Sequence, residues 1–169
     1  MKKIYLLIIA LSIFLDANSQ VPSFSWARAM GNSGPDGGQG IITDASGNVY
    51  TIGYFQGTVD FDPGAGVLNL SSAGSYDIYI QKLDASGNFV WAKRMGAAGI
   101  DNGYSIKIDA TGNIYTTGRF SNTVDFDPGA GTFNLISGGS TDIFVQKLDA
   151  LGNFLWAKKI GDAGGDQGN

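Results

Sequence analysis

Residues 58–66 read Thr-Val-Asp-Phe-Asp-Pro-Gly-Ala-Gly, and the same nine residues recur without a change at 123–131. The three tryptophans keep the same interval of 65 residues, as do three aspartates. A constant interval between unrelated residue types is the signature of an internal repeat. Residues 26–90 and 91–155 align without a gap, so we expect two consecutive units of one repeat architecture.

Composition favours strands over helices. The chain has 26 glycines and 12% aromatic residues, but only 15% charged residues. Aromatic and β-branched residues suit strands, and glycine supplies the backbone conformations that tight turns require. Histidine and cysteine are absent. This excludes disulfides, thiolate or imidazole metal sites, and Ser-His or Cys-His catalytic pairs built from this chain alone.

Two turn sequences punctuate each unit. Asp-Ala-Ser-Gly-Asn lies between apolar runs at 44–48 and again at 84–88. Aspartate at the first position accepts hydrogen bonds from following amides, and glycine three residues later adopts a left-handed conformation, so both predict β-hairpins. The first unit therefore has four principal strands, A to D, at approximately 39–44, 48–55, 77–84 and 88–95.

An insertion at residues 56–76 separates strands B and C and contains the nine-residue motif. Val59 and Phe61 alternate with Asp60 and Asp62, and Pro63 ends the extended run. We expect an extra hairpin that projects beyond the body of the sheet.

Four-stranded antiparallel units that are apolar on both faces need neighbours to bury them, as the blades of a β-propeller do. The fold class predicted is all-β, with two complete blades plus flanking D strands in an incomplete propeller, because rings typically close with four to eight blades. The expected divisions are an N-terminal D strand at 20–31, blade 1 at 32–95, blade 2 at 96–160 and the truncated start of a third repeat at 161–169.

Residues 1–19 are typical of a signal peptide, with Lys2 and Lys3 before an apolar run and Ala17-Asn18-Ser19 as a small-residue cleavage site. A membrane anchor is the alternative, but the apolar run is shorter than the roughly 20 residues that span a bilayer. We therefore expect a secreted, extracellular or bacterial cell-surface protein with no membrane span after cleavage. The net charge of −4 without a basic cluster argues against nucleic-acid partners.

Three segments carry a family resemblance: Gly-Asn-Val-Tyr-Thr-Ile-Gly at 47–53, Asp-Ile-Tyr-Ile-Gln-Lys-Leu-Asp-Ala-Ser-Gly-Asn-Phe-Val-Trp at 77–91, and Gly-x-x-Gly-x-Asp-x-Gly at 96–103. Together they resemble the SBBP repeats of bacterial secreted and surface proteins, in a long-blade variant. The resemblance implies a β-propeller. It implies no particular activity, because the family is defined by its blades.

The carboxylate pairs in the repeated motif are candidate calcium ligands. Residues i and i+2 of a strand point the same way, so Asp60 and Asp62 converge, and the next turn offers backbone carbonyls. Asp125 and Asp127 repeat the arrangement. The alternative is that each pair is the solvated face of an edge hairpin, where charges discourage strand-to-strand aggregation.

The loops that carry Asp36 and Asp101 are expected on the same face as the insertions, which makes that face the predicted binding face. Trp26, Trp91 and Trp156 favour inter-blade core over a sugar-stacking platform, since each occupies the same mid-strand position. Lys82 and Lys147, within apolar strands, are expected to extend toward solvent or to pair with an aspartate.

The leading functional hypothesis is a non-enzymatic interaction or adhesion scaffold within a larger extracellular protein. Its partner would be a protein or polysaccharide, besides further blades or self-association, and no cofactor is expected apart from possible calcium. The alternative is a carbohydrate-active or cofactor-bearing propeller enzyme whose catalytic residues lie in other blades. Equivalent acids in every blade favour the scaffold, because an active site usually breaks the symmetry of its fold.

Overall fold

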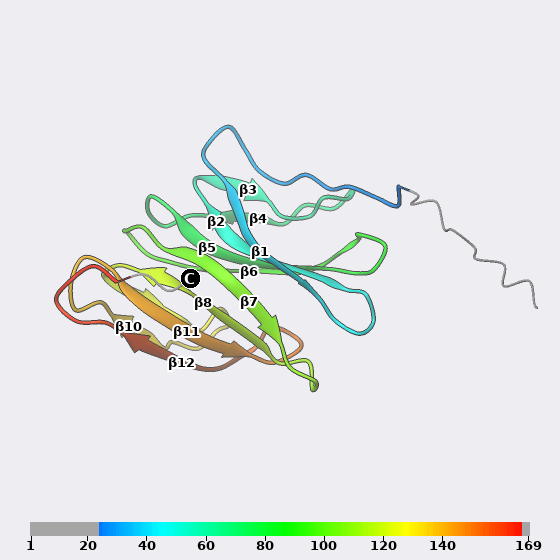
Figure 1. Ribbon diagram of the computed structural model, residues 1–169. Helices are drawn as coiled ribbons and strands as arrows, with labels where there is room; N and C mark the ends of the chain where they lie inside the picture. Colours follow the sequence, from blue (N-terminus) through cyan, green and yellow to red (C-terminus); the bar gives the residue numbers. More distant parts are fainter. Residues whose placement is uncertain (1–23, 167–169) are drawn as a thin grey trace, which may run out of the picture.

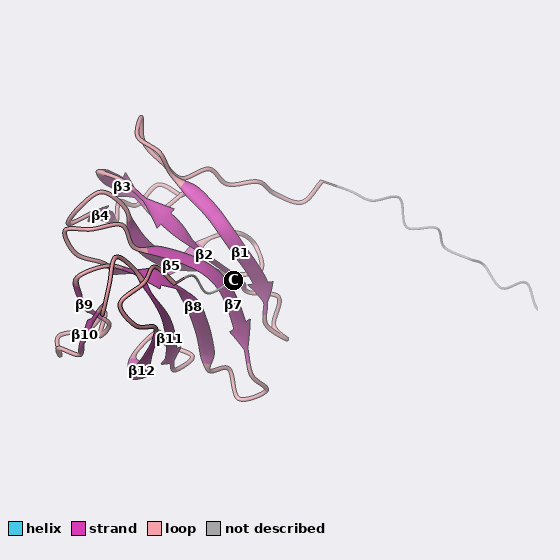
Figure 2. Cartoon of the chain, turned by 60° about the vertical axis from the view of Figure 1, so that its left-hand side comes forward, coloured by secondary structure: helices cyan, strands magenta, loops and turns pink. Residues whose placement is uncertain are grey.

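The computed structural model describes residues 24–166, and within them the chain is entirely strands and loops (Figures 1 and 2). The predicted signal peptide lies outside the described residues. In the described part, no helix is long and apolar enough to cross a membrane.

Each repeat unit forms one four-stranded antiparallel sheet, as predicted. The first sheet has the order β1-β2-β5-β6 and the second has the order β7-β8-β11-β12 (Figure 1). The central strands are therefore β2 and β5 in the first sheet, and β8 and β11 in the second. The bounds are β1 Gly37–Thr43, β2 Val49–Phe55, β5 Asp77–Leu83, β6 Phe89–Met95, β7 Asn102–Ile108, β8 Ile114–Phe120, β11 Asp142–Leu148 and β12 Phe154–Ile160.

The aspartate turns have the predicted chemistry. The amide of Gly47 donates to the carbonyl of Asp44 at 3.0 Å, and the Asp44 carboxylate accepts from the amides of Ser46 and Asn48. Gly47 has a φ of 78°, a left-handed conformation that favours glycine. The same bonds recur at the other three turns, which begin at Asp84, Asp109 and Asp149.

The insertion hairpin corrects one prediction, because it folds back over its own sheet instead of projecting beyond it. Its strands are β3 Thr58–Asp60 and β4 Asn69–Ser71 in the first unit, and β9 Thr123–Asp125 and β10 Asn134–Ile136 in the second. Val59 and Phe61 are only 2% exposed. A projecting hairpin would leave these two apolar side chains in water, and burying each is worth about 1.5–3 kcal/mol.

The main core lies between the two sheets. Tyr50, Ile52 and Met95 of the first unit pack with Phe120 and Phe144 of the second, and all five are fully buried. The folded-back motif of the second unit contributes to the same core. The remaining members of this core are Ile78, Ile80, Ile106, Ile114, Val124, Phe126, Leu148 and Ala157.

A buried glutamine connects the sheet, the motif and the preceding unit. The side-chain nitrogen Nε2 of Gln146 donates to the carbonyl of Phe126 at 2.7 Å and lies 3.0 Å from the sulfur of Met95. Gln81 makes the same contacts in the first unit, with the carbonyl of Phe61 and the sulfur of Met30. Each unit therefore uses a methionine that comes from the chain before it.

Residues 24–30 correct a second prediction, because the described part of this N-terminal segment forms no strand. The segment is held against the first unit through side chains, with Trp26 Nε1 donating to the carbonyl of Ala85 at 3.1 Å and Arg28 Nε to that of Gly87 at 2.9 Å. A D strand takes its ladder of hydrogen bonds from a C strand, and no C strand of the described chain lies beside this segment.

The start of the third repeat follows the path of the second. The amide of Asp166 donates to the carbonyl of Thr141 at 2.8 Å, just as the amide of Asp101 donates to that of Tyr76 at 2.9 Å. Each connection thus leaves the last strand of a unit in the same direction.

Equivalent isoleucines test the role of the inter-unit core. Ile106 is 3% exposed, whereas Ile41, at the same position of the first unit, is 70% exposed. We expect Ile106→Ala to lower the free energy of unfolding by about 2–5 kcal/mol, because it leaves a cavity in the core. The matched control Ile41→Ala should change it by less than about 0.5 kcal/mol. Urea denaturation measures both, and equal losses would contradict this account of the core.

Candidate functional site

The surface feature that recurs with the repeat is a groove between the motif hairpin and the end of the preceding unit, which we call the insertion groove. In the second unit, Lys93 and Arg94 of β6 lie on one side of it and Asp125 and Asp127 on the other. The groove therefore presents both signs of charge to solvent. Its other lining residues are Leu70, Ala92, Met95, Gly96, Pro128 and Gly129.

The first unit has the same groove with fewer charges. Asp60 and Asp62 again form one side, while Met30 and Asn32 of the N-terminal segment lie on the other. The two grooves are built by the same motif on equivalent parts of the fold, so they form a periodic surface.

The candidate calcium ligands close the turn of the motif. One oxygen of Asp125 accepts hydrogen bonds from the amides of Asp127 at 3.0 Å and Phe133 at 2.8 Å. One oxygen of Asp127 accepts from the amide of Gly129 at 2.8 Å. Asp60 and Asp62 make the equivalent bonds. Among residues 24–166, no group of three or more acidic, histidine or cysteine side chains is placed to hold a metal ion. Calcium binding here stays a proposal.

Two substitutions at Asp125 separate the turn-closing role from calcium binding. Asp125→Ala should lower stability by about 1–3 kcal/mol because it leaves two backbone amides without their acceptor, whereas Asp125→Asn keeps an acceptor oxygen and should cost less. If the carboxylate acts through the turn, melting temperatures will be the same in chelator and in millimolar calcium. A calcium-dependent rise in melting temperature that Asp125→Asn abolishes would instead establish a metal site.

The residues predicted for the binding face have different surroundings. Asp101 is fully buried, so it cannot contact a partner directly. Its two oxygens accept from the amides of Ala97 at 2.9 Å and Ser121 at 2.8 Å, which joins the connection between units to the end of β8. Asp36 is partly buried and accepts from the amides of Asn32 and Gln56. Both aspartates therefore hold loops, and the prediction that Asp101 lies on an exposed binding face is wrong.

Burial raises the pKa of Asp101 from 3.8 to about 6. The backbone amides of Ala97 and Ser121 oppose this rise, the charge of Asp77 adds to it, and that of Arg94 opposes it. Because the pKa is higher in the folded state than in the unfolded state, the folded protein binds more protons between these two values.

We therefore expect Asp101 to make the protein less stable as the pH rises from about 4 to about 6, by about 2–3 kcal/mol in total. Asp101→Asn has no titrating group at this position. The wild type should therefore lose stability relative to Asp101→Asn as the pH rises over that range. Urea denaturation at several pH values measures this. Asp84→Asn is the control, because the pKa of Asp84 is lowered by its bonds to Asn88 and the residue does not titrate there. Parallel pH curves for the wild type and Asp101→Asn would contradict the assignment.

Sequence reasoning missed a buried aspartate at the start of each C strand. Asp77 and Asp142 are fully buried, and each forms an ion pair with a cation of the adjacent D strand, Arg94 and Lys159 respectively. Each also accepts one backbone amide, from Ala73 and from Gly138. The 65-residue interval between the two aspartates was the available signal. In both residues the oxygen Oδ2 makes these contacts, whereas Oδ1 is buried without a hydrogen-bond partner in the described part of the chain.

The inter-blade position predicted for the tryptophans is seen at Trp91, because a Cβ at Gly152 of the second unit would lie 3.3 Å from its ring. Trp91 packs against the main core and meets Tyr50 edge to face, with ring centroids 6.2 Å apart. Trp156, on the uncovered side of the second unit, is 36% exposed. Lys82 and Lys147 are partly buried, and their ammonium groups lie 4.9 and 5.0 Å from the ring centroids of Tyr50 and Tyr115. Of the two alternatives predicted for these lysines, pairing with an aspartate is not seen among the described residues.

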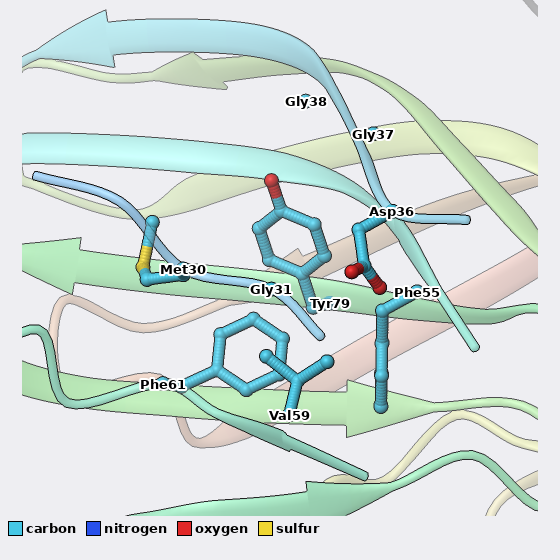
Figure 3. A pocket seen from close by; sticks show the side chains of 9 residues that line it. All are labelled: Met30, Gly31, Asp36, Gly37, Gly38, Phe55, Val59, Phe61 and Tyr79. Carbon is cyan, nitrogen blue, oxygen red and sulfur yellow. The ribbon is translucent and has the colours of Figure 1, made fainter. Parts of the chain in front are cut away.

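The first unit has an open hollow (Figure 3) beside a second, smaller hydrophobic cluster that is separate from the main core. Phe55, Phe61 and Tyr79 form its apolar wall, and Met30 and Asp36 lie at its edge (Figure 3). Its remaining lining residues are Gly31, Gly37, Gly38 and Val59.

The chain is all-β, and its two four-stranded antiparallel sheets pack against each other without closing into a ring, an arrangement consistent with two blades of an incomplete β-propeller. Residues 90–119, from β6 to β8, match the family model described as SBBP, a beta-propeller repeat. The predicted SBBP resemblance is thereby confirmed.

Two curated proteins are similar to the chain. One is an uncharacterized WD repeat-containing protein of Acanthamoeba polyphaga mimivirus, 29% identical over 58% of this chain and 8% of its own length. The other is the regulatory protein FlaEY of Caulobacter vibrioides (strain ATCC 19089 / CIP 103742 / CB 15), 27% identical over 71% of this chain and 12% of its own length. The chain thus spans only a small fraction of either relative.

Proposed function

We propose that this chain is a non-enzymatic interaction scaffold within a larger secreted or cell-surface protein. The observation that carries the proposal is the recurrence of the insertion groove in both blades, built by the same motif. A periodic surface suits an extended partner that is itself repetitive, such as a polysaccharide or an extended polypeptide. The carboxylates that line both grooves, together with Lys93 and Arg94 in the groove of the second unit, favour a polar partner that is bound through hydrogen bonds.

The use of the acidic side chains also supports a scaffold. In both blades the turn aspartates and the motif aspartates accept hydrogen bonds from backbone amides, and Asp77 and Asp142 are paired with cations. Side chains that maintain the loops at every equivalent position serve the fold. They are poorly suited to move protons during a reaction.

Affinity electrophoresis of the chain through gels that contain single polysaccharides tests the proposal. We expect at least one polysaccharide to retard the protein. Lys93→Glu should lower the affinity derived from this retardation about tenfold, because it removes a cation from the groove. Lys158→Glu is the matched control, since Lys158 is the equivalent residue of blade 2, is exposed and does not line the insertion groove.

The same incubations are analysed for released sugars. Retardation without product supports the scaffold, whereas product release would support the enzyme alternative. If Lys93→Glu and Lys158→Glu weaken binding equally, the insertion groove is not the binding surface.

A further inference from the structure

One cluster of side chains in blade 2, which we call the arginine corner, consists of Asn102, Tyr104 and Arg119. Asn102 of β7 lies directly opposite Arg119 of β8 in the antiparallel pair that these strands form (Figure 1). The guanidinium carbon of Arg119 lies 6.0 Å from the centroid of the Tyr104 ring. The side-chain nitrogen Nδ2 of Asn102 donates to the hydroxyl of Tyr104 at 3.5 Å. Two adjacent strands thus bring a cation, an amide and a phenol together.

Blade 1 has different residues at these three positions, namely Gly37, Gln39 and Tyr54. The ring of Tyr54 meets that of Tyr76 edge to face, with centroids 5.2 Å apart, and a Cβ at Gly37 would lie 2.7 Å from Tyr54. Blade 2 has Thr141 at the position of Tyr76, so the second ring has no counterpart. Blade 1 therefore fills this corner with aromatic rings, whereas blade 2 places a charged group there. Residues that serve the fold recur in both blades, and a set that occurs once suits a ligand.

Two polar atoms of the arginine corner have no partner within residues 24–166. Asn102 is only 8% exposed, and its oxygen Oδ1 is buried without a hydrogen bond. The nitrogen Nε of Arg119 is likewise buried without an acceptor, and the ion pairs of the described residues involve Arg94 and Lys159 instead. A buried donor or acceptor that is left unsatisfied costs about 1–3 kcal/mol, and more if it is charged. The corner thus offers one cationic donor and one oxygen acceptor to a ligand.

The chemistry of these groups defines the ligand. A guanidinium donates two parallel hydrogen bonds to a planar oxyanion, and a single cation balances the one charge of a carboxylate better than the two charges of a phosphate. The oxygen of Asn102 can only accept, so it requires a hydroxyl or an N–H group.

We propose that the arginine corner binds a hydroxy-carboxylate, the chemistry that a uronic acid carries. The carboxylate of the ligand accepts hydrogen bonds from Arg119, and a hydroxyl of the ligand donates to Oδ1 of Asn102. The ligand takes the place that the ring of Tyr76 has in blade 1. This site is separate from the insertion groove, which none of the three residues lines.

Titration of sodium glucuronate into the chain tests the proposal, with the side-chain N–H signals of Arg119 and Asn102 followed by NMR at constant ionic strength. We expect both signals to shift in a saturable manner, with a dissociation constant below about 10 mM. Glucose has the hydroxyls without the carboxylate, and acetate has the carboxylate without the hydroxyls. Each should bind at least about tenfold more weakly than glucuronate.

The repeat supplies matched variants, because each position has an equivalent in blade 1. Arg119→Tyr and Asn102→Gly introduce the residues of blade 1 and should each weaken glucuronate binding at least about tenfold. Lys107→Ile also introduces a residue of blade 1 and removes an exposed cation of β7 outside the corner, so it should bind as the wild type does. Arg119→Lys keeps the charge but loses the planar fork, and it should also weaken binding if Arg119→Tyr does not fold.

Absence of saturation below about 10 mM glucuronate, equal affinity for acetate or inorganic phosphate, or equal losses in Arg119→Tyr and Lys107→Ile would overturn the proposal. Lys93→Glu, in the insertion groove, should leave glucuronate binding unchanged. Failure to bind glucuronate with polysaccharide retardation intact would reject this inference alone, and the reverse result would reject the proposed function alone.

Discussion

The side-chain amide of Gln146 is the interaction on which the arrangement of the two blades depends. The residue is fully buried. Its side-chain nitrogen donates to the carbonyl of Phe126 and lies beside the sulfur of Met95. A buried amide without partners costs about 1–3 kcal/mol, so the three segments must meet at one point. The motif hairpin, which folds back to bury its apolar side chains, therefore meets the last strand of the preceding blade at this amide.

Because this contact spans two blades, each unit is completed by the chain that precedes it. Gln81 makes the same contact in the first blade, where the sulfur beside its side-chain nitrogen is that of Met30. The N-terminal segment is consequently held in the position of a last strand although its backbone is unpaired. Stability in such an array depends on the interfaces between neighbours, as in other repeat proteins.

The insertion groove, which we propose as the binding surface, forms where the folded-back motif meets the preceding blade. Folding the motif back buries Phe126 and brings Asp127 and its turn alongside Arg94 of the preceding blade. The Asp-Pro-Gly sequence of the motif thus has two roles, since it ends the hairpin that packs the core and forms one side of a polar groove.

The sequence by itself determined the period, the strands and the aspartate turns, because hydrophobic alternation and turn chemistry act within a few residues. Local signals could not show that the insertion folds back, that Asp101 is buried or that residues 24–30 remain unpaired. The tertiary structure decided these features, because each depends on which segment covers a given side. Ile41 and Ile106 make the reason plain: they are the same residue at the same position of the repeat, and only the presence of a neighbouring blade separates 70% exposure from 3%.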